Sequence, residues 1–301
     1  MSTASPILTS LKRQRPEWEP WLAVVEEVLQ EAEVRAWADA VPEIVAGSSA
    51  APRLAGATVA VQRNVAERLF DRLLRRASRS STREMATLAH ARSTQLDILD
   101  LFGASACQAA DRIAGAAAAC GADPDAFQAV AALLPVPFLQ ACNRSWGSSI
   151  PQDWVEPYCP VCGSWPAFAE VRGIERSRYY RCGRCGGEWR AHVLSCPYCA
   201  TIDHRDLVAL VPGSPGTSAV IDTCQRCLGY VKTFNRLQGC APLAVMLEDL
   251  GGVALDVAAL EQGYSRPAGS GYALGVAVTN GDTRRGFAGR GFRGFFETWN
   301  T

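Results

Sequence analysis

Hydrophobic residues recur at helical spacing over the first half of the chain. Between residues 18 and 40 the apolar positions, among them Trp21, Val24 and Val28, lie three or four residues apart, which predicts an amphipathic helix. The same pattern predicts four more helices, at residues 57–76, 82–101, 105–119 and 123–134. Because the connections between them are short, we expect residues 1–144 to form an antiparallel helical domain.

The pattern changes after residues 145–158, where Gly, Ser and Pro replace the helical period and predict a linker. Short segments rich in strand-forming residues then predict β-strands at 165–171, 177–181, 188–194, 206–211, 217–223 and 230–234. One helix is predicted at 242–262, within a C-terminal helical segment at 241–266, and the Gly- and Arg-rich residues 267–301 are predicted to be a flexible tail. The expected fold class is α+β: an all-α domain followed by small β modules.

Four Cys-x-x-Cys pairs coincide with these strands. They divide the region into two modules, residues 159–194 and 195–240. If the turn formed by one Cys-x-x-Cys pair is called a knuckle, each module has the order knuckle, strand, turn, strand, knuckle, strand. This order is typical of rubredoxin-like or zinc-ribbon modules, and modules of this size need a metal ion to fold. The first site is predicted to hold one ion with Cys159, Cys162, Cys182 and Cys185, and the second with Cys196, Cys199, Cys224 and Cys227.

A metal role suits these cysteines better than a redox role, since thioredoxin-type motifs do not recur four times in one chain. Closed four-thiolate sites leave no position for a substrate, which favours structural ions. Thiolates accept iron and zinc alike, so the donor set does not choose between them. His192 and His204 lie near the third knuckle, but eight sulfurs already fill two tetrahedra.

Composition and charge narrow the range of functions. Thirty basic and thirty acidic residues cancel, so no overall field attracts the chain to nucleic acid or to a membrane. The N-terminal residues lack the order of a signal peptide, and no apolar run approaches the roughly 18 to 20 residues of a spanning helix, so a cytoplasmic protein is expected. Dinucleotide-binding, P-loop, nucleophile-elbow and zinc-protease motifs are absent from the sequence, and an enzyme is therefore not expected.

The four knuckles resemble those of the FdhE family of formate dehydrogenase accessory proteins. The knuckles are followed by Glu248-Asp249-Leu250, Leu255-Asp256 and the run from Glu261 to Arg266, which resemble that family's C-terminal signature. The resemblance implies a cytoplasmic, non-catalytic maturation factor that carries rubredoxin-like iron sites and contacts the catalytic subunit of formate dehydrogenase. It thus favours iron over zinc. In one respect the chain departs from its own pattern, because Ala200 and Leu228 stand where Gly163 and Gly186 follow the earlier knuckles.

Arginine and aromatic residues alternate in the first module, and such mixtures are favoured at the centres of protein interfaces. A partner-binding surface is therefore predicted at Arg178, Tyr179, Tyr180 and Arg181. Single-stranded nucleic acid favours the same side chains, so a nucleic-acid-binding ribbon protein is an alternative. A rubredoxin-like electron carrier is another.

Overall fold

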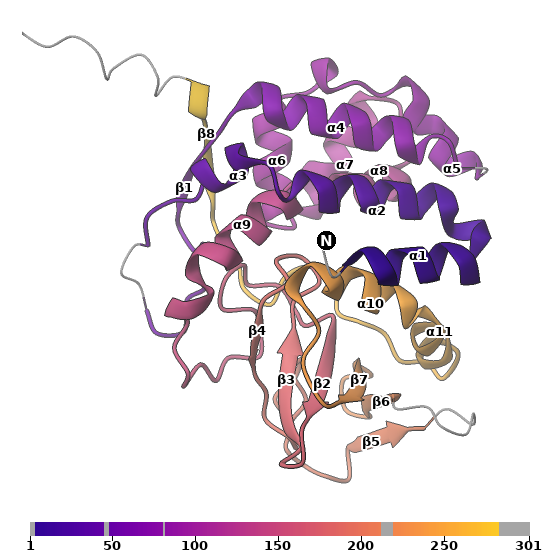
Figure 1. Ribbon diagram of the computed structural model, residues 1–301, viewed down its shortest axis with the longest axis vertical. Helices are drawn as coiled ribbons and strands as arrows, with labels where there is room; N and C mark the ends of the chain where they lie inside the picture. The colour runs from indigo at the N-terminus through magenta and orange to yellow at the C-terminus, as the bar shows by residue number, and fades with distance from the viewer. Residues whose placement is uncertain (1–3, 45–47, 81, 212–218, 283–301) are drawn as a thin grey trace, which may run out of the picture.

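The computed structural model describes residues 4–44, 48–80, 82–211 and 219–282. The helical half and the sheet half form two stacked parts, with the helices above the sheet in Figure 1. Helices α10 (Val245–Gly251) and α11 (Val253–Glu261) follow the sheet in sequence, and α10 lies between the sheet and α1 (Ala4–Gln14), which it contacts. The observed class is α+β, as the sequence predicts.

The helical half is built around α4 (Arg63–Ala77) and α2 (Glu19–Glu31), which pack side by side. Aromatic side chains fill its centre, with Trp37 stacked on Phe102 at 6.0 Å between ring centroids and Phe102 edge-on to Phe138 at 5.7 Å. The remaining helices are α3 (Arg35–Asp39), α5 (Arg83–Ala86), α6 (Ile98–Ala106), α7 (Ala110–Ala119), α8 (Pro124–Ala131) and α9 (Val136–Trp146).

Several of these bounds differ from the predicted ones. The helix predicted at 57–76 begins only at Arg63, because residues 58–61 form strand β1 (Thr58–Val61), and its β-branched Val59 and Val61 are buried. The helix predicted at 82–101 is broken into α5, two 3-10 turns and the start of α6. Helices α1 and α9 were not expected. Pro135 is the N-cap of α9 and Pro137 lies in its first turn, which agrees with the preference of proline for that position.

The six strands of the two modules form one continuous sheet in the order β4-β3-β2-β7-β6-β5. The first module supplies β2 (Phe168–Arg172), β3 (Ser177–Arg181) and β4 (Glu188–Arg190), and the second supplies β5 (Leu207–Leu210), β6 (Ala219–Cys224) and β7 (Tyr230–Arg236). Pairs within each module are antiparallel, whereas β2 and β7 run parallel, with Phe168 opposite Lys232. The modules are thus joined edge to edge through their backbones.

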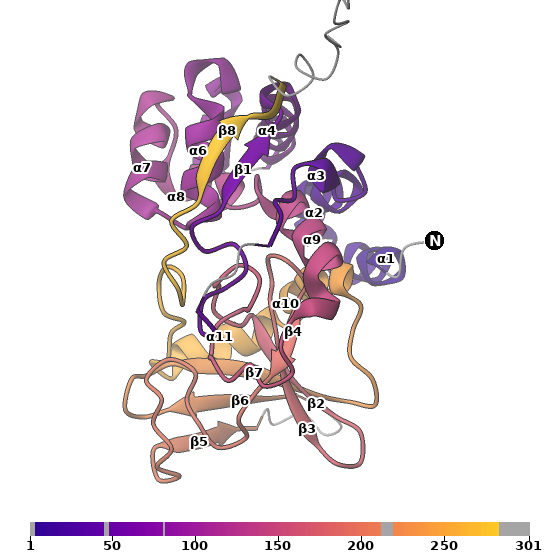
Figure 2. The ribbon, with the colours of Figure 1, turned by 90° about the vertical axis from the view of Figure 1, so that its left-hand side faces the viewer.

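The C-terminal region differs from the prediction in two ways. The single helix expected at 242–262 is instead a 3-10 turn followed by α10 and α11, which meet at Gly251 and Gly252. Part of the expected flexible tail is ordered, since β8 (Ala277–Asn280) pairs in parallel with β1, on the helical half (Figure 2). The rest of that tail, residues 283–301, lies outside the described residues.

The two halves share one hydrophobic core, which corrects the expectation of a separating linker. A single buried cluster runs from Phe70 and Phe138 in the helices to Val161, Cys162 and Tyr180 in the first module. The predicted linker contributes to it, because Trp154 is buried and its indole N–H donates to the carbonyl of Tyr158 at 3.0 Å. Loss of one half would therefore expose apolar surface of the other.

One stretch of the described chain, Pro124–Ser149, is long and apolar enough to be considered as a membrane span, contrary to the sequence expectation. It comprises α8, α9 and the turns beside them, and 72% of its most apolar window is buried inside the protein. Burial of this kind is what a core helix of the helical half requires.

Candidate metal centres

The first group of cysteines is formed by two tight turns that face each other. The sulfurs of Cys159, Cys162, Cys182 and Cys185 all lie within 4.8 Å of one another. Each turn is closed by the backbone: Gly163 N–H donates to the carbonyl of Cys159 at 2.9 Å, and Gly186 N–H donates to that of Cys182 at 3.0 Å. All four cysteines are fully buried. Four thiols brought together in this way match the donor set of a tetrahedral ion, which they could hold.

Polar groups surround these sulfurs and would stabilise negative charge on them. Gly187 N–H donates to the sulfur of Cys185 at 3.4 Å, and the Ser164 hydroxyl lies 3.4 Å from the sulfur of Cys162. Hydrogen bonds from the other three cysteines hold the pKa of Cys162 well below its ordinary value, and the nearby Arg184 guanidinium lowers it further. Burial raises the pKa of Cys159 and Cys185. The thiols of this group therefore differ in how readily they lose a proton. A bound cation would take the place of the protons that the thiols still carry.

Arg184 also connects this site to the helical half. Its guanidinium donates to the backbone carbonyls of Ser105 at 2.6 Å and Ala106 at 3.0 Å, at the end of α6. Carbonyl groups at a helix C-terminus attract cations. The arginine therefore places a positive charge beside the buried thiols and holds the two halves together.

The second group repeats this geometry with a different environment. The sulfurs of Cys196, Cys199, Cys224 and Cys227 also lie within 4.8 Å of one another. Cys196 and Cys224 are buried, Cys199 is half-buried and Cys227 is exposed. The structure therefore brings the eight cysteines into the same two groups that the sequence pairs by module, and each group could hold one ion.

The third and fourth knuckles need a backbone conformation that favours glycine. The residue after the second cysteine has a positive φ in all four turns: 66° at Gly163, 75° at Gly186, 58° at Ala200 and 56° at Leu228. A residue with a Cβ atom is strained there. Ala200 and Leu228 therefore destabilise the turns in which they lie, because each must adopt the positive φ that the knuckle requires.

The predicted partner-binding surface is not a surface in the structure. Arg178, Tyr180 and Arg181 are buried, with exposed fractions of 9%, 3% and 1%, and only Tyr179 is half-exposed. Tyr180 belongs to the shared hydrophobic core, and the two arginines are covered by partners within the sheet.

The two arginines of that set act within the sheet. Arg178 pairs with Asp222 at 2.8 Å, and Arg181 pairs with Glu170 at 3.2 Å and Glu188 at 3.0 Å. Their charges are compensated inside the protein, so they are not offered to nucleic acid either.

Two buried charged residues were missed by the sequence prediction. Glu170 and Lys232 are both fully buried, on the paired strands β2 and β7. Lys232 pairs with Asp249 at 2.7 Å and Asp256 at 2.8 Å, and both carboxylates also pair with Arg266. The signal was available, because Lys232 is one of only two lysines in the chain and is the only charged residue of the strand predicted at 230–234. This network fastens α10 and α11 to the sheet.

Other potential metal ligands lie outside both cysteine groups. His192 is exposed, as is His204, so neither replaces a thiolate in either group. Cys120 and Cys142 are buried among apolar side chains, and burial raises the pKa of both thiols. Cys107 is only half-buried.

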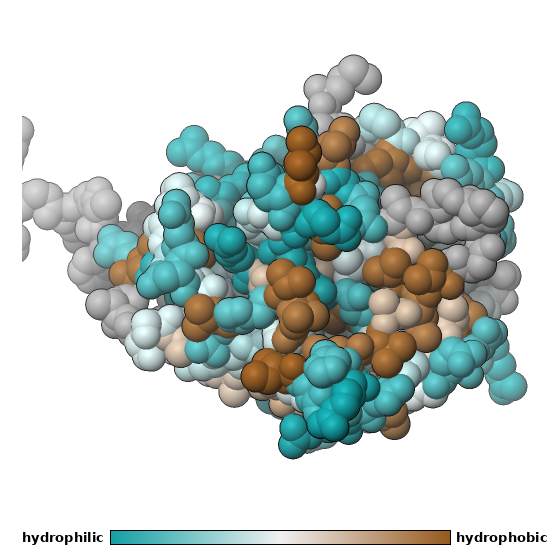
Figure 3. Space-filling view, turned by 90° about the horizontal axis from the view of Figure 1, so that it is seen from below, coloured by the Kyte–Doolittle hydropathy of each residue, from teal (hydrophilic) through white to brown (hydrophobic). Residues whose placement is uncertain are grey.

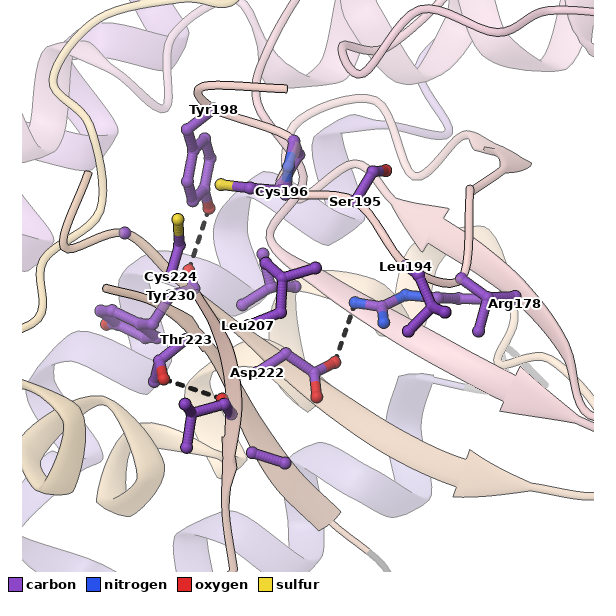
Figure 4. A pocket seen from close by; sticks show the side chains of 16 residues that line it. Arg178, Leu194, Ser195, Cys196, Tyr198, Leu207, Asp222, Thr223, Cys224 and Tyr230 are labelled. Atoms are coloured by element: carbon purple, nitrogen blue, oxygen red, sulfur yellow. Dashed lines mark hydrogen bonds and ion pairs between the residues drawn. The ribbon is translucent and has the colours of Figure 1, made fainter. Parts of the chain in front are cut away.

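Several hollows lie beside the cysteine groups. One, of about 400 Å³, lies between the halves and is lined by Trp21, Trp165, Arg184, Tyr198 and Arg266 among others. A second, of about 180 Å³, lies against Cys196 and Cys224 (Figure 4). Figure 4 shows the Arg178–Asp222 ion pair at one end of it and the hydrogen bond from Tyr198 to the carbonyl of Tyr230 at the other. The second hollow thus has no uncompensated charge among the described residues that line it.

Comparison with known proteins finds relatives in sequence and in fold. No family model matches the chain. It is 33% identical over 115 residues to the Protein FdhE homolog of Aquifex aeolicus, a match covering 37% of this chain and 40% of that protein. It is 35% identical over 114 residues to the FdhE homolog of Pseudomonas aeruginosa, covering 36% and 37%. The crystal structure of the FdhE protein from Pseudomonas aeruginosa has the same fold, with a TM-score of 0.55 and 20% identity over 90% of this chain and 95% of that one.

Part of the chain is thus similar in sequence to FdhE proteins, and its fold is that of an FdhE protein. The sequence match spans well under half the length of the curated FdhE relatives, whereas the fold match spans nearly all of this chain. The two comparisons are complementary, because one rests on residue identity over a segment and the other on the arrangement of helices and strands. The FdhE fold therefore includes the helical half as well as the cysteine modules.

Proposed function

We propose that this protein is a non-catalytic accessory factor for formate dehydrogenase, which assists maturation by binding the enzyme's catalytic subunit. The observation that carries the proposal is the sequence similarity to FdhE proteins. The geometry supports a binding role over a catalytic one, since each cysteine group supplies four thiolates and leaves an ion no open position for substrate. We place this activity in the cytoplasm, where the reducing environment keeps such thiols available for metal.

The cofactors in this proposal are two metal ions, one in each cysteine group. The donor sets fit iron or zinc, and the family resemblance favours iron in rubredoxin-like sites. Their contribution is to hold the two knuckles of each module together and so to stabilise the module. The residues around them then present the surface that the partner meets.

The partner surface in this proposal lies on the sheet half. Of twelve large hydrophobic side chains exposed among the described residues, only Val34 and Ile44 belong to the helical half, and two more belong to α11. The other eight lie between residues 155 and 237: Val155, Ile174, Val193, Leu194, Ile202, Val211, Leu228 and Leu237. Seen from below, the sheet half carries hydrophobic side chains between hydrophilic ones (Figure 3). Exposed apolar groups gathered on one part of a protein indicate a protein interface.

Within this surface Val193 and Leu194 are the strongest candidates for contact. They are 63% and 65% exposed and line both the 180 Å³ hollow and a neighbouring one of about 470 Å³. An apolar segment of an incompletely folded catalytic subunit would fill such hollows with its side chains. This segment would need no charge at the 180 Å³ hollow, because Arg178 there is already paired.

The experiment is retention of the catalytic subunit on the immobilised, metal-loaded protein. We expect the wild type to retain it and the Val193→Asp/Leu194→Asp variant to lose about ten-fold or more in affinity, the loss of a typical interface hot spot. Val34→Asp, on the helical half and 40% exposed, is the matched control and should bind as the wild type does. Absence of retention by the wild type, or normal formate oxidation in a cell lacking the protein, would refute the function.

A further inference from the structure

The two cysteine groups differ in how far solvent reaches them. Cys159, Cys162, Cys182 and Cys185 each have an exposed fraction of 0%. In the second group Cys196 is 5% exposed and Cys224 is 2% exposed, but Cys199 is half-buried and Cys227 is exposed. Solvent therefore does not reach the cysteines of the first group, whereas it reaches the second group at Cys227.

The first group is closed by segments from three distant parts of the chain. Residues 53 and 54 donate backbone hydrogen bonds to the carbonyls of Pro160 and Val161. Tyr272 N–H donates to the carbonyl of Gly163 at 3.0 Å, and a Cβ atom at Gly163 would lie 3.0 Å from that of Tyr272. At the other knuckle a Cβ atom at Gly186 would lie 2.5 Å from the Pro242 carbonyl oxygen. The first group can meet solvent only if these segments separate.

The second group has cover on one side only. Tyr198 packs against Gly229, where a Cβ atom would meet the tyrosine ring at 2.4 Å, and Ser265 N–H donates to the carbonyl of Leu228 at 2.8 Å. The knuckle tip itself, from Gln225 to Leu228, is exposed. Cys227 is thus accessible to an incoming molecule without any movement of the helical half.

We propose that the second cysteine group is an exchangeable metal site that opens at Cys227, whereas the first group releases its ion much more slowly. The incoming ligand is a soft donor, a thiolate or a nitrogen chelator, which takes the place of the Cys227 thiolate first. The strained φ at Leu228 favours this step, because release of Cys227 lets the turn relax.

The exchange balances without a redox change. Each cysteine thiolate that leaves the ion takes up one proton from solvent, and each incoming thiol that binds gives one up. No electron is transferred. In the first group the same substitution requires separation of the shared core, which is a larger opening with a larger free energy.

The test is the rate of metal release from the full-length protein loaded with zinc in both groups. The protein is mixed with an excess of the chromophoric chelator 4-(2-pyridylazo)resorcinol. We expect it to release one equivalent of zinc about ten-fold or more faster than the other, because the second group needs only a local opening whereas the first needs the shared core to open. Cys227→Ser should lose the fast equivalent and keep the slow one. Arg226→Ala changes the neighbouring exposed residue and should keep both.

Alkylation supplies a second readout that does not depend on how the variants fold. The wild type is treated with iodoacetamide after the fast phase, and the modified peptides are identified by mass spectrometry. We expect label on Cys196, Cys199, Cys224 and Cys227 before any on the first group. Equal release rates, a fast equivalent that persists in Cys227→Ser, or earlier label on the first group would overturn the proposal. None of these measurements involves formate dehydrogenase, so their outcome is independent of the proposed function.

Discussion

Lys232 and Asp256 form an ion pair of 2.8 Å in which the lysine side chain is completely buried. The pair joins β7 to α11, and Tyr230 donates to the same carboxylate at 2.7 Å. A buried charge that loses its partner is strongly destabilising. Asp256→Asn is therefore expected to lower the free energy of unfolding by about 3 kcal/mol in chemical denaturation.

An exposed ion pair serves as the control for this measurement. Asp203 pairs with Arg205 at 2.6 Å on the surface, where the arginine side chain is 79% exposed. Asp203→Asn should leave the denaturation midpoint unchanged, because water screens such pairs. Equal effects of the two substitutions would show that the Lys232 network does not hold α11 in place.

The same network predicts how stability depends on pH. Burial opposes ionisation of Asp249, but the charges of Arg266 and Lys232 hold its pKa below the ordinary value of 3.8. A carboxyl whose pKa is lowered on folding stabilises the protein above its unfolded pKa, and this stabilisation disappears as pH falls through the folded pKa. Thermal unfolding should show a decline in stability below about pH 4 that is smaller in Asp249→Asn. If Asp249→Asn shows the same decline as the wild type, the decline is due to other carboxylates, such as Glu170, whose pKa is also lowered.

The knuckle turns predict that glycine is the favoured residue after the second cysteine in both modules. Ala200 has a φ of 58° and is exposed, so Ala200→Gly should relieve strain and raise the unfolding free energy of the metal-loaded protein by about 0.5 to 1 kcal/mol. Gly186→Ala, at the matching position of the first module, should destabilise it, because the new Cβ would clash with the Pro242 carbonyl. Differential scanning calorimetry measures both. A destabilising Ala200→Gly would contradict the strain argument.

Metal removal should affect both halves of the protein together. The first cysteine group belongs to the same buried cluster as Phe102 and Phe138 of the helical half. When chelation removes both ions, helicity should therefore fall in step with the appearance of reactive thiols, followed by circular dichroism and a thiol reagent. Full helicity after all eight thiols have become reactive would show that the helical half folds alone.

The end of the described chain is predicted to contribute to stability. Leu274 is buried, and Val278 of β8 packs against Gly103, where a Cβ atom would lie 3.1 Å from the valine side chain. Truncation after Arg266 should lower the free energy of unfolding by at least about 2 to 5 kcal/mol, the usual value for one buried leucine. Truncation after Asp282 keeps all of these contacts and is the control. Equal stability of the two truncated chains would contradict the role of β8.

The sequence alone was sufficient for features that depend on local spacing. Two residues between cysteines form a turn that aims both sulfurs at one point, and the repeat along the chain pairs neighbouring turns, so the two groups of four follow from the sequence. Helical periodicity likewise identified most of the helical half, and α4 carries its buried residues on one stripe as predicted.

Only the tertiary structure decided which charged and aromatic residues face water. Arg178 and Arg181 have the composition of a binding surface, but β3 lies between two strands and their charges meet Asp222 and Glu170 from other strands. The parallel pair of β2 and β7, the return of β8 to β1 and the unequal cover of the two cysteine groups depend on contacts between residues far apart in the chain. Periodicity and motif spacing carry no information about such contacts, because each depends on how separate elements pack.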